Sequence, residues 1–132
     1  MVAGIAYRGD VTFELEPVTG DSISINGWNW RPTLELLHRT AVLSAETLEL
    51  MSFTGGGGQA TSGEAERIAE FLDSYLAGLG PGDRVTFNGA VTAEPDTGEF
   101  HRDDLARNYS ATYEWLARFR DFCRSSGGFR LY

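Results

Sequence analysis

Residues 109–129, YSATYEWLARFRDFCRSSGGF, form the longest amphipathic stretch of the chain. Successive residues of a helix lie 100° apart, and at this spacing the charged residues gather on one half of the cylinder. The other half carries Tyr109, Thr112, Tyr113, Trp115, Leu116, Phe119, Phe122 and Cys123. A large aromatic residue can bury about 150–250 Å², so we expect this helix to dominate the core. Gly127 follows the last turn, where a left-handed glycine often ends a helix.

Alternation of apolar and polar residues predicts strands on both sides of this helix. Residues 11–16, VTFELE, and residues 22–25, SISI, alternate around a turn, which predicts a hairpin. Residues 84–92, RVTFNGAVT, predict a further strand that bends at Gly89. Residues 129–132, FRLY, alternate again and predict a strand after the long helix.

Local capping signals predict three more helices. Proline suits the first helical position and pushes the preceding residue out of helical geometry, so one helix should begin at Pro32 and run to residue 41. Ser44 is typical of the cap of a short helix through residue 50. Thr61 and Glu64 have the spacing of a capping box, which predicts a long helix to residue 79.

These segments together predict the α+β class. We expect an antiparallel sheet of about four or five strands, packed by two long helices and one or two short helices. Tetraglycine at residues 55–58 predicts a flexible loop, and Asp103 or Asp104 would cap the final helix. The length of 132 residues fits a single compact domain over residues 1–132.

Composition restricts the chemistry of the chain. All eleven basic residues are arginine, which excludes a Walker lysine, a pyridoxal Schiff base and any lysine nucleophile. Nineteen acidic residues give a net charge of −8, which argues against general nucleic-acid binding and favours a basic protein partner. The single Cys123 excludes an intrachain disulfide and is typical of a small buried side chain. Without a charged leader or a membrane-length apolar run, we expect a cytoplasmic protein with no membrane contact.

One surface candidate combines Trp28, Trp30, Arg31 and His38. Tryptophan and arginine are enriched at binding hot spots, and an extended segment before Pro32 would point both indoles to one side. The alternative is that the indoles seal one end of the core, which is the usual place for tryptophan in a small domain. His38 could act as a general base beside a carboxylate, or it could simply be a half-buried helix residue.

Other candidates carry weaker signals. Arg120 lies at the margin of the apolar half of the long helix, where it could anchor an anionic ligand or pair with a carboxylate such as Glu35 or Glu49. The carboxylates and His101 of residues 94–104 could hold a divalent metal, but turns and helix starts use the same residue types. We therefore expect no metal and no cofactor.

Two further stretches, WNWRPT at residues 28–33 and FCRSSGGF at residues 122–129, support a resemblance. They resemble small uncharacterised bacterial proteins that carry a W-x-W-R-P segment and an F-C-x-x-S-G-G-F helix end. The resemblance implies a bacterial intracellular protein with one compact domain. It assigns no activity and carries over no catalytic residue.

The sequence supports two hypotheses of function. The first is a non-enzymatic binding protein with an acidic surface, for example an immunity-type or adaptor protein. The alternative is a small enzyme or small-molecule binder with an aromatic and arginine pocket near Trp28, Trp30, Arg31 and His38, whose ligand would be a small anion. A deep cavity would favour the second hypothesis, and a flat patch would favour the first. Whether the protein is an enzyme, and its oligomeric state, stay open at this point.

Overall fold

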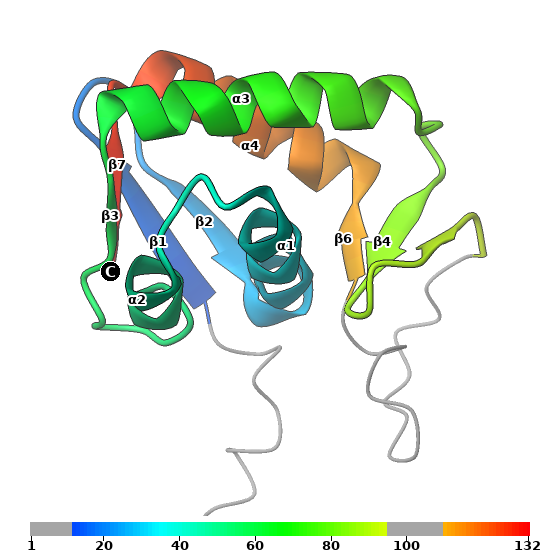
Figure 1. Ribbon diagram of the computed structural model, residues 1–132, viewed down its shortest axis with the longest axis horizontal. Helices are drawn as coiled ribbons and strands as arrows, with labels where there is room; N and C mark the ends of the chain where they lie inside the picture. The colour runs from blue at the N-terminus through cyan, green and yellow to red at the C-terminus, as the bar shows by residue number, and fades with distance from the viewer. Residues whose placement is uncertain (1–11, 95–109) are drawn as a thin grey trace, which may run out of the picture.

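Residues 12–94 and 110–132 are described by the structure, which is a computed structural model (Figure 1). They form helices and antiparallel strands, which confirms the α+β class. The order along the chain is β1 (Thr12–Pro17), β2 (Ile23–Asn26), α1 (Gly27–Thr40), α2 (Ala45–Leu50), β3 (Gln59–Ala60), α3 (Ser62–Ala77), β4 (Arg84–Thr86), β5 (Val91–Thr92), β6 (Ser110–Thr112), α4 (Tyr113–Ser126) and β7 (Phe129–Leu131).

The larger sheet has the strand order β2-β1-β7-β3. The predicted hairpin is present: β1 and β2 pair antiparallel, with Phe13 opposite Ile25. The last strand, β7, pairs with β1 and places Leu131 opposite Leu15. These four residues face the core, whereas neighbours such as Arg130 are exposed. This alternation is expected, because successive residues of a strand point to opposite faces of the sheet.

The smaller sheet has the order β5-β4-β6. Residues 84–92 were predicted as one bent strand, and this prediction is wrong, because the chain reverses there. Gly89 has a φ of 89° and donates its N–H to the Thr86 carbonyl oxygen at 2.9 Å. Asn-Gly pairs favour such tight reversals, so β4 and β5 form a hairpin instead.

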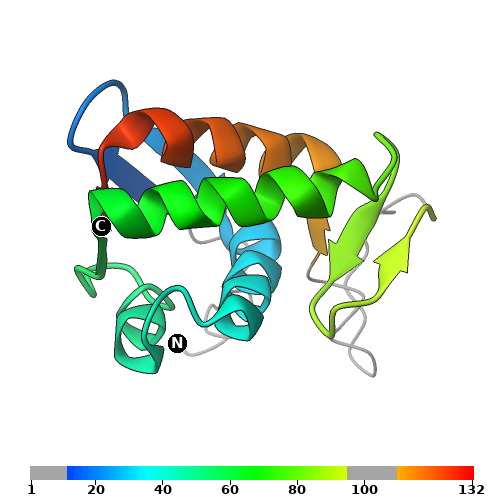
Figure 2. The ribbon, with the colours of Figure 1, turned by 45° about the horizontal axis from the view of Figure 1, so that its top comes forward.

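Helix α4 joins the two sheets, since it runs from β6 in the smaller sheet to β7 in the larger one. It lies side by side with α3 (Figures 1 and 2). The helix begins later than predicted, at Tyr113, because residues 110–112 pair with β4 and the Thr112 side chain caps it. The predicted caps Asp103 and Asp104 lie outside the described residues. Gly127 ends the helix with a φ of 69°, as predicted.

Helix α1 also begins elsewhere than predicted, at Gly27 rather than at Pro32. The Asn26 side chain caps it by accepting the Asn29 backbone N–H at 3.0 Å. Pro32 lies inside the helix, where a proline normally removes one backbone hydrogen bond. The cap, together with complete burial of Trp30, outweighs that loss.

The core is built around Trp30, which is 0% exposed. The ring of Phe119 meets it edge-on at a centroid distance of 5.5 Å, and the rings of Trp115 and Phe13 both lie at 6.3 Å. Trp30 Nε1 donates to the Met51 carbonyl oxygen at 2.8 Å, so its one polar group is satisfied. As predicted, α4 supplies a large part of this cluster.

Tetraglycine forms a loop after α2, as predicted, and this loop packs closely against that helix. A Cβ at Gly56 would overlap the Leu50 carbonyl oxygen, and one at Gly58 would lie 2.7 Å from a carbon of the Met51 side chain. Gly55 and Gly57 have φ values of 81° and 76°. Glycine is therefore required here by contact and by backbone conformation.

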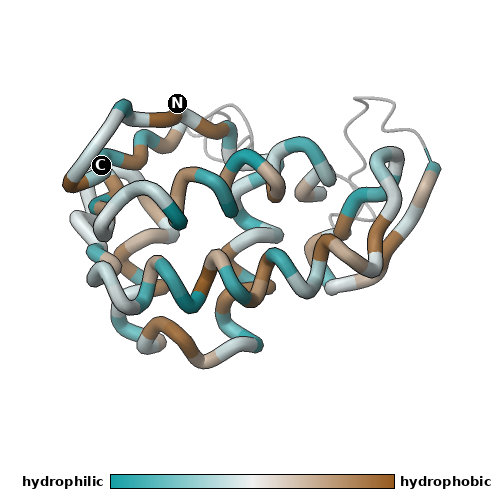
Figure 3. The backbone as a smooth tube through the Cα atoms, turned by 90° about the horizontal axis from the view of Figure 1, so that it is seen from above, coloured by the Kyte–Doolittle hydropathy of each residue, from teal (hydrophilic) through white to brown (hydrophobic). Residues whose placement is uncertain are grey.

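Seen from above, hydrophobic and hydrophilic residues alternate along the helices, as expected for helices that each bury one side (Figure 3). Among the described residues, no helix is long and apolar enough to cross a membrane.

Candidate functional site

A groove lies between α1 and α2 and contains several of the predicted site residues. Its volume is about 310 Å³, at the lower end of the usual range for ligand pockets. Three segments line it, and we call it the α1–α2 groove. Its lining residues are Arg31, Leu34, Glu35 and His38 of α1, Ala45, Leu48, Glu49 and Ser52 of α2 and the turn after it, and Phe87 of the β4–β5 hairpin.

The sequence builds this groove by helical spacing. On each helix the lining residues are three or four positions apart, which places them on one face. The hydrogen bond from Trp30 to the Met51 carbonyl oxygen holds the start of α1 against the end of α2. The lining residues of α1 and those of α2 therefore run in opposite directions along the groove. Arg31 lies near the Ser52 end, and His38 lies near the Ala45 end. Leu34 and Leu48 are buried and form an apolar floor.

Arg31 is the unusual residue of the groove. Its Nε is buried and has no hydrogen-bond partner, a condition that only Arg84 Nη1 shares among the side chains of the described residues. Nor does its guanidinium form an ion pair with any residue that the structure describes. Buried polar side-chain atoms are nearly always hydrogen-bonded, so this unused donor makes Arg31 a candidate binding residue of the groove.

Two carboxylates share the groove with Arg31. Glu35 follows it by one helical turn, and Glu49 lies on the facing helix. Neither belongs to an ion pair within the described part of the chain. The groove therefore presents one guanidinium, two carboxylates and the His38 imidazole around an apolar floor.

Arg120 lies far from this groove, on α4, and its side chain is 23% exposed. It contacts Asp73 of α3 at 3.3 Å and Asp121 at 3.0 Å, so the suggested partners Glu35 and Glu49 are wrong. The hydrogen bond with Asp121 is the main cause that raises the pKa of Arg120. Arg120 is thus paired with carboxylates, as one alternative predicted, but its partners are Asp73 and Asp121, and it cross-links the two long helices.

The structure separates Trp28 and Trp30 from the remaining candidates. Both belong to α1, where residues two positions apart point in nearly opposite directions, so the expected pair of indoles on one side does not form. Trp30 lies in the core and has no surface to offer a ligand. Trp28 is half-buried and does not line the groove. His38 does line it and is exposed rather than half-buried.

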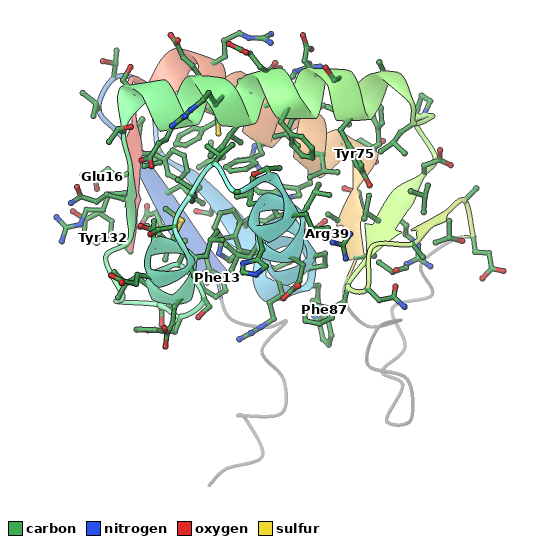
Figure 4. The ribbon with its side chains drawn as sticks, in the orientation of Figure 1. Phe13, Glu16, Arg39, Tyr75, Phe87 and Tyr132 are labelled. Carbon is green, nitrogen blue, oxygen red and sulfur yellow. The ribbon has the colours of Figure 1, made fainter. Side chains whose placement is uncertain are left out.

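Phe87 was missed by the sequence analysis. It is brought to the groove by the β4–β5 hairpin, which α1 also contacts: a Cβ at Gly89 would overlap the Arg39 guanidinium. Figure 4 shows Arg39 pointing from α1 toward this hairpin, with Phe87 at the near end of the hairpin. The β4–β5 hairpin lies some fifty residues after α1 in the sequence, so no local sequence signal predicts that Phe87 reaches the groove. The lining residues on α1 and α2 could have been found from their spacing.

Other candidates contribute nothing to the groove. Cys123 is buried and without a disulfide, and burial raises the pKa of its thiol well above the usual range, so the thiol is unreactive. His101 and residues 95–104 of the acidic run lie outside the described residues. Within residues 12–94 and 110–132, no group of three potential metal ligands is found.

Comparisons with family models, with curated proteins and with solved structures gave no significant match. The resemblance to W-x-W-R-P proteins therefore stays a prediction.

Proposed function

We propose that this chain is a non-enzymatic binding protein that holds a small ligand in the α1–α2 groove. The ligand carries an anionic group, a carboxylate or a phosphate, and Arg31 receives it. The observation that carries the proposal is the buried Arg31 Nε without a hydrogen-bond partner, next to a groove of about 310 Å³.

The physical reason is the hydrogen bond that Arg31 lacks. Leaving a buried donor unsatisfied costs about 1–3 kcal/mol, and more for a charged group. A carboxylate or phosphate that enters the groove can accept two parallel hydrogen bonds from a guanidinium, once a rotation of the side chain turns Nε toward it. Ligand binding would then recover free energy that the unliganded protein lacks. The apolar floor of Leu34 and Leu48 would cover the ligand's hydrocarbon part.

The test is a thermal-shift and calorimetric screen of small carboxylates and organic phosphates. We expect at least one to bind the parent protein, and Arg31→Lys to weaken that binding about tenfold or more, because lysine keeps the charge but lacks the planar fork. Arg67→Lys, at an exposed arginine on α3, is the matched control and should bind like the parent. Equal binding by parent and Arg31→Lys would contradict the proposal.

A second candidate is a small enzyme that uses the same groove. His38, Glu35 and Glu49 all line it, and an imidazole near carboxylates can act in general acid–base catalysis. Recovery of a bound ligand chemically unchanged after long incubation supports the binding protein. Its conversion by the parent, but not by His38→Gln, supports the enzyme.

We also propose that the protein acts as an immunity-type or adaptor protein that binds a basic protein partner. The support for this proposal is the net charge of −8, which would attract a basic partner. Co-purification of a basic protein at low salt, lost at high salt, is the expected result.

A further inference from the structure

The α1–α2 groove carries both signs of charge, and this restricts the chemistry of its ligand. Formal charges of +1 on Arg31 and −1 on each of Glu35 and Glu49 give the lining a net charge of −1 with His38 neutral. A ligand with anionic groups alone would gain the contact with Arg31 but would also face two carboxylates. Like charges near a binding site oppose such a ligand.

A cationic group on the same ligand removes this conflict. Glu35 follows Arg31 by four residues, so the two side chains leave α1 about 6 Å apart along its axis. Glu49 lies on the opposite wall, three residues before Ser52. Leu34 and Leu48, which are 8% and 7% exposed, supply the apolar surface within the groove. The lining therefore offers an anion receptor, a short apolar floor and two cation receptors.

We propose that the ligand of this groove is a small zwitterion, with a carboxylate on Arg31 and an ammonium group on Glu35 and Glu49, separated by a short hydrocarbon chain. This inference rests on the proposed function, because it assumes that Arg31 receives the anionic group. It goes further by assigning a role to the two glutamates.

The absence of ion pairs within the groove supports this assignment. Arg31 forms no ion pair with either glutamate, although all three residues line the same groove. By contrast, Arg120 and Arg124 of α4 both form ion pairs with Asp73 of α3, at 3.3 Å. The charges of the groove are thus not paired with one another in the described structure. A zwitterion of matching length bridges them and satisfies both signs at once.

Three probes of equal chain length test the inference: 5-aminopentanoate, pentanoate and pentylamine, each titrated into the whole chain by calorimetry. We expect 5-aminopentanoate to bind about tenfold or more tightly than either single-charge probe, since each lost charge contact weakens binding. Glu35→Gln/Glu49→Gln should reduce that preference over pentanoate to about threefold or less. Glu46→Gln, on α2 but outside the groove, is the matched control and should retain the full preference.

The outcomes separate this inference from the proposed function. Equal or tighter binding of pentanoate than of 5-aminopentanoate to the parent overturns the zwitterion, while an Arg31-dependent carboxylate site still stands. If the double variant Glu35→Gln/Glu49→Gln keeps the full preference for 5-aminopentanoate over pentanoate, only the role of the two glutamates is overturned. Binding that ignores the carboxylate, with pentylamine as good as 5-aminopentanoate, contradicts both. No binding of any probe at millimolar concentration overturns the zwitterion, while an organic phosphate that binds the parent more tightly than Arg31→Lys would still support the proposed function.

Discussion

At the scale of single residues, two neighbouring positions of α1 have different roles. Trp30 is a tryptophan next to a candidate site, yet it fills the centre of the core. Arg31, its neighbour, lines the groove and keeps an unused donor. Helical geometry alone separates their roles, because adjacent residues on a helix point 100° apart.

The glycines of the loop after α2 give a residue-scale prediction. Gly56→Ala should destabilise the fold by about 1–3 kcal/mol or more, because its Cβ would overlap the Leu50 carbonyl oxygen and the backbone would have to move. Gly63→Ala in α3 is the control, since a Cβ there has open space around it. It should stabilise by about 0.4–1 kcal/mol. Chemical denaturation measures both, and an unchanged Gly56→Ala protein would show that the loop is as flexible as the sequence suggested.

At the scale of elements, a short chain of hydrogen bonds fastens α1 to α4. Trp115 Nε1 donates to Thr33 Oγ1 at 2.8 Å, and this hydroxyl donates in turn to the Asn29 carbonyl oxygen at 2.8 Å. The Asn29 side-chain oxygen also accepts the Thr112 backbone N–H at 3.1 Å, just before α4 begins. The start of α4 is thereby held against the helix that carries Arg31.

This network predicts the effect of Thr33→Val, which keeps the shape of the side chain but removes its hydroxyl. We expect a loss of about 1–3 kcal/mol in the free energy of unfolding, because the indole N–H of Trp115 is left buried and unsatisfied. A double-mutant cycle with Trp115→Phe separates this from packing, and should show a coupling of about 0.5 kcal/mol or more. Additive losses would mean that the hydrogen bond contributes nothing.

The elements also show what sequence can predict. Ser44 as the cap of α2, the Thr61–Glu64 capping box and the left-handed Gly127 were all predicted, because each signal lies within one helical turn. The start of α1 was missed, because the local rule for Pro32 is outweighed by the Asn26 cap and by burial of Trp30. The cap is a local signal that was overlooked, whereas the burial of Trp30 is a long-range effect.

Prediction of the site from sequence was limited in the same way, because local signals do not show how distant elements pack. Arg31 and His38 were predicted as site residues and do line one groove. Glu35 and Glu49 were considered only as partners of Arg120, and Phe87 was not considered at all. Their meeting depends on how α1, α2 and a distant hairpin pack, and no short stretch of sequence carries that information.

At the scale of the whole molecule, α3 and α4 cover one side while α1 and α2 face the other (Figure 1). The ion pairs between the two long helices, around Asp73, involve no residue of the groove. The charged residues that cross-link the long helices are thus different from those that we propose bind the ligand. Variants of the groove carboxylates should therefore change binding without a large change in unfolding.

The central claim is that Arg31 is the anion receptor of the α1–α2 groove, and its own Nε–H resonance tests this most directly. Nitrogen-15 NMR can follow the arginine Nε–H groups while 5-aminopentanoate is added to the whole chain, with Arg31→Lys used to assign the signal. We expect the Arg31 resonance to move downfield and to exchange more slowly with water as its missing hydrogen bond forms, while the Arg67 resonance is unchanged. An Arg31 resonance that stays in place while the ligand binds would contradict the account.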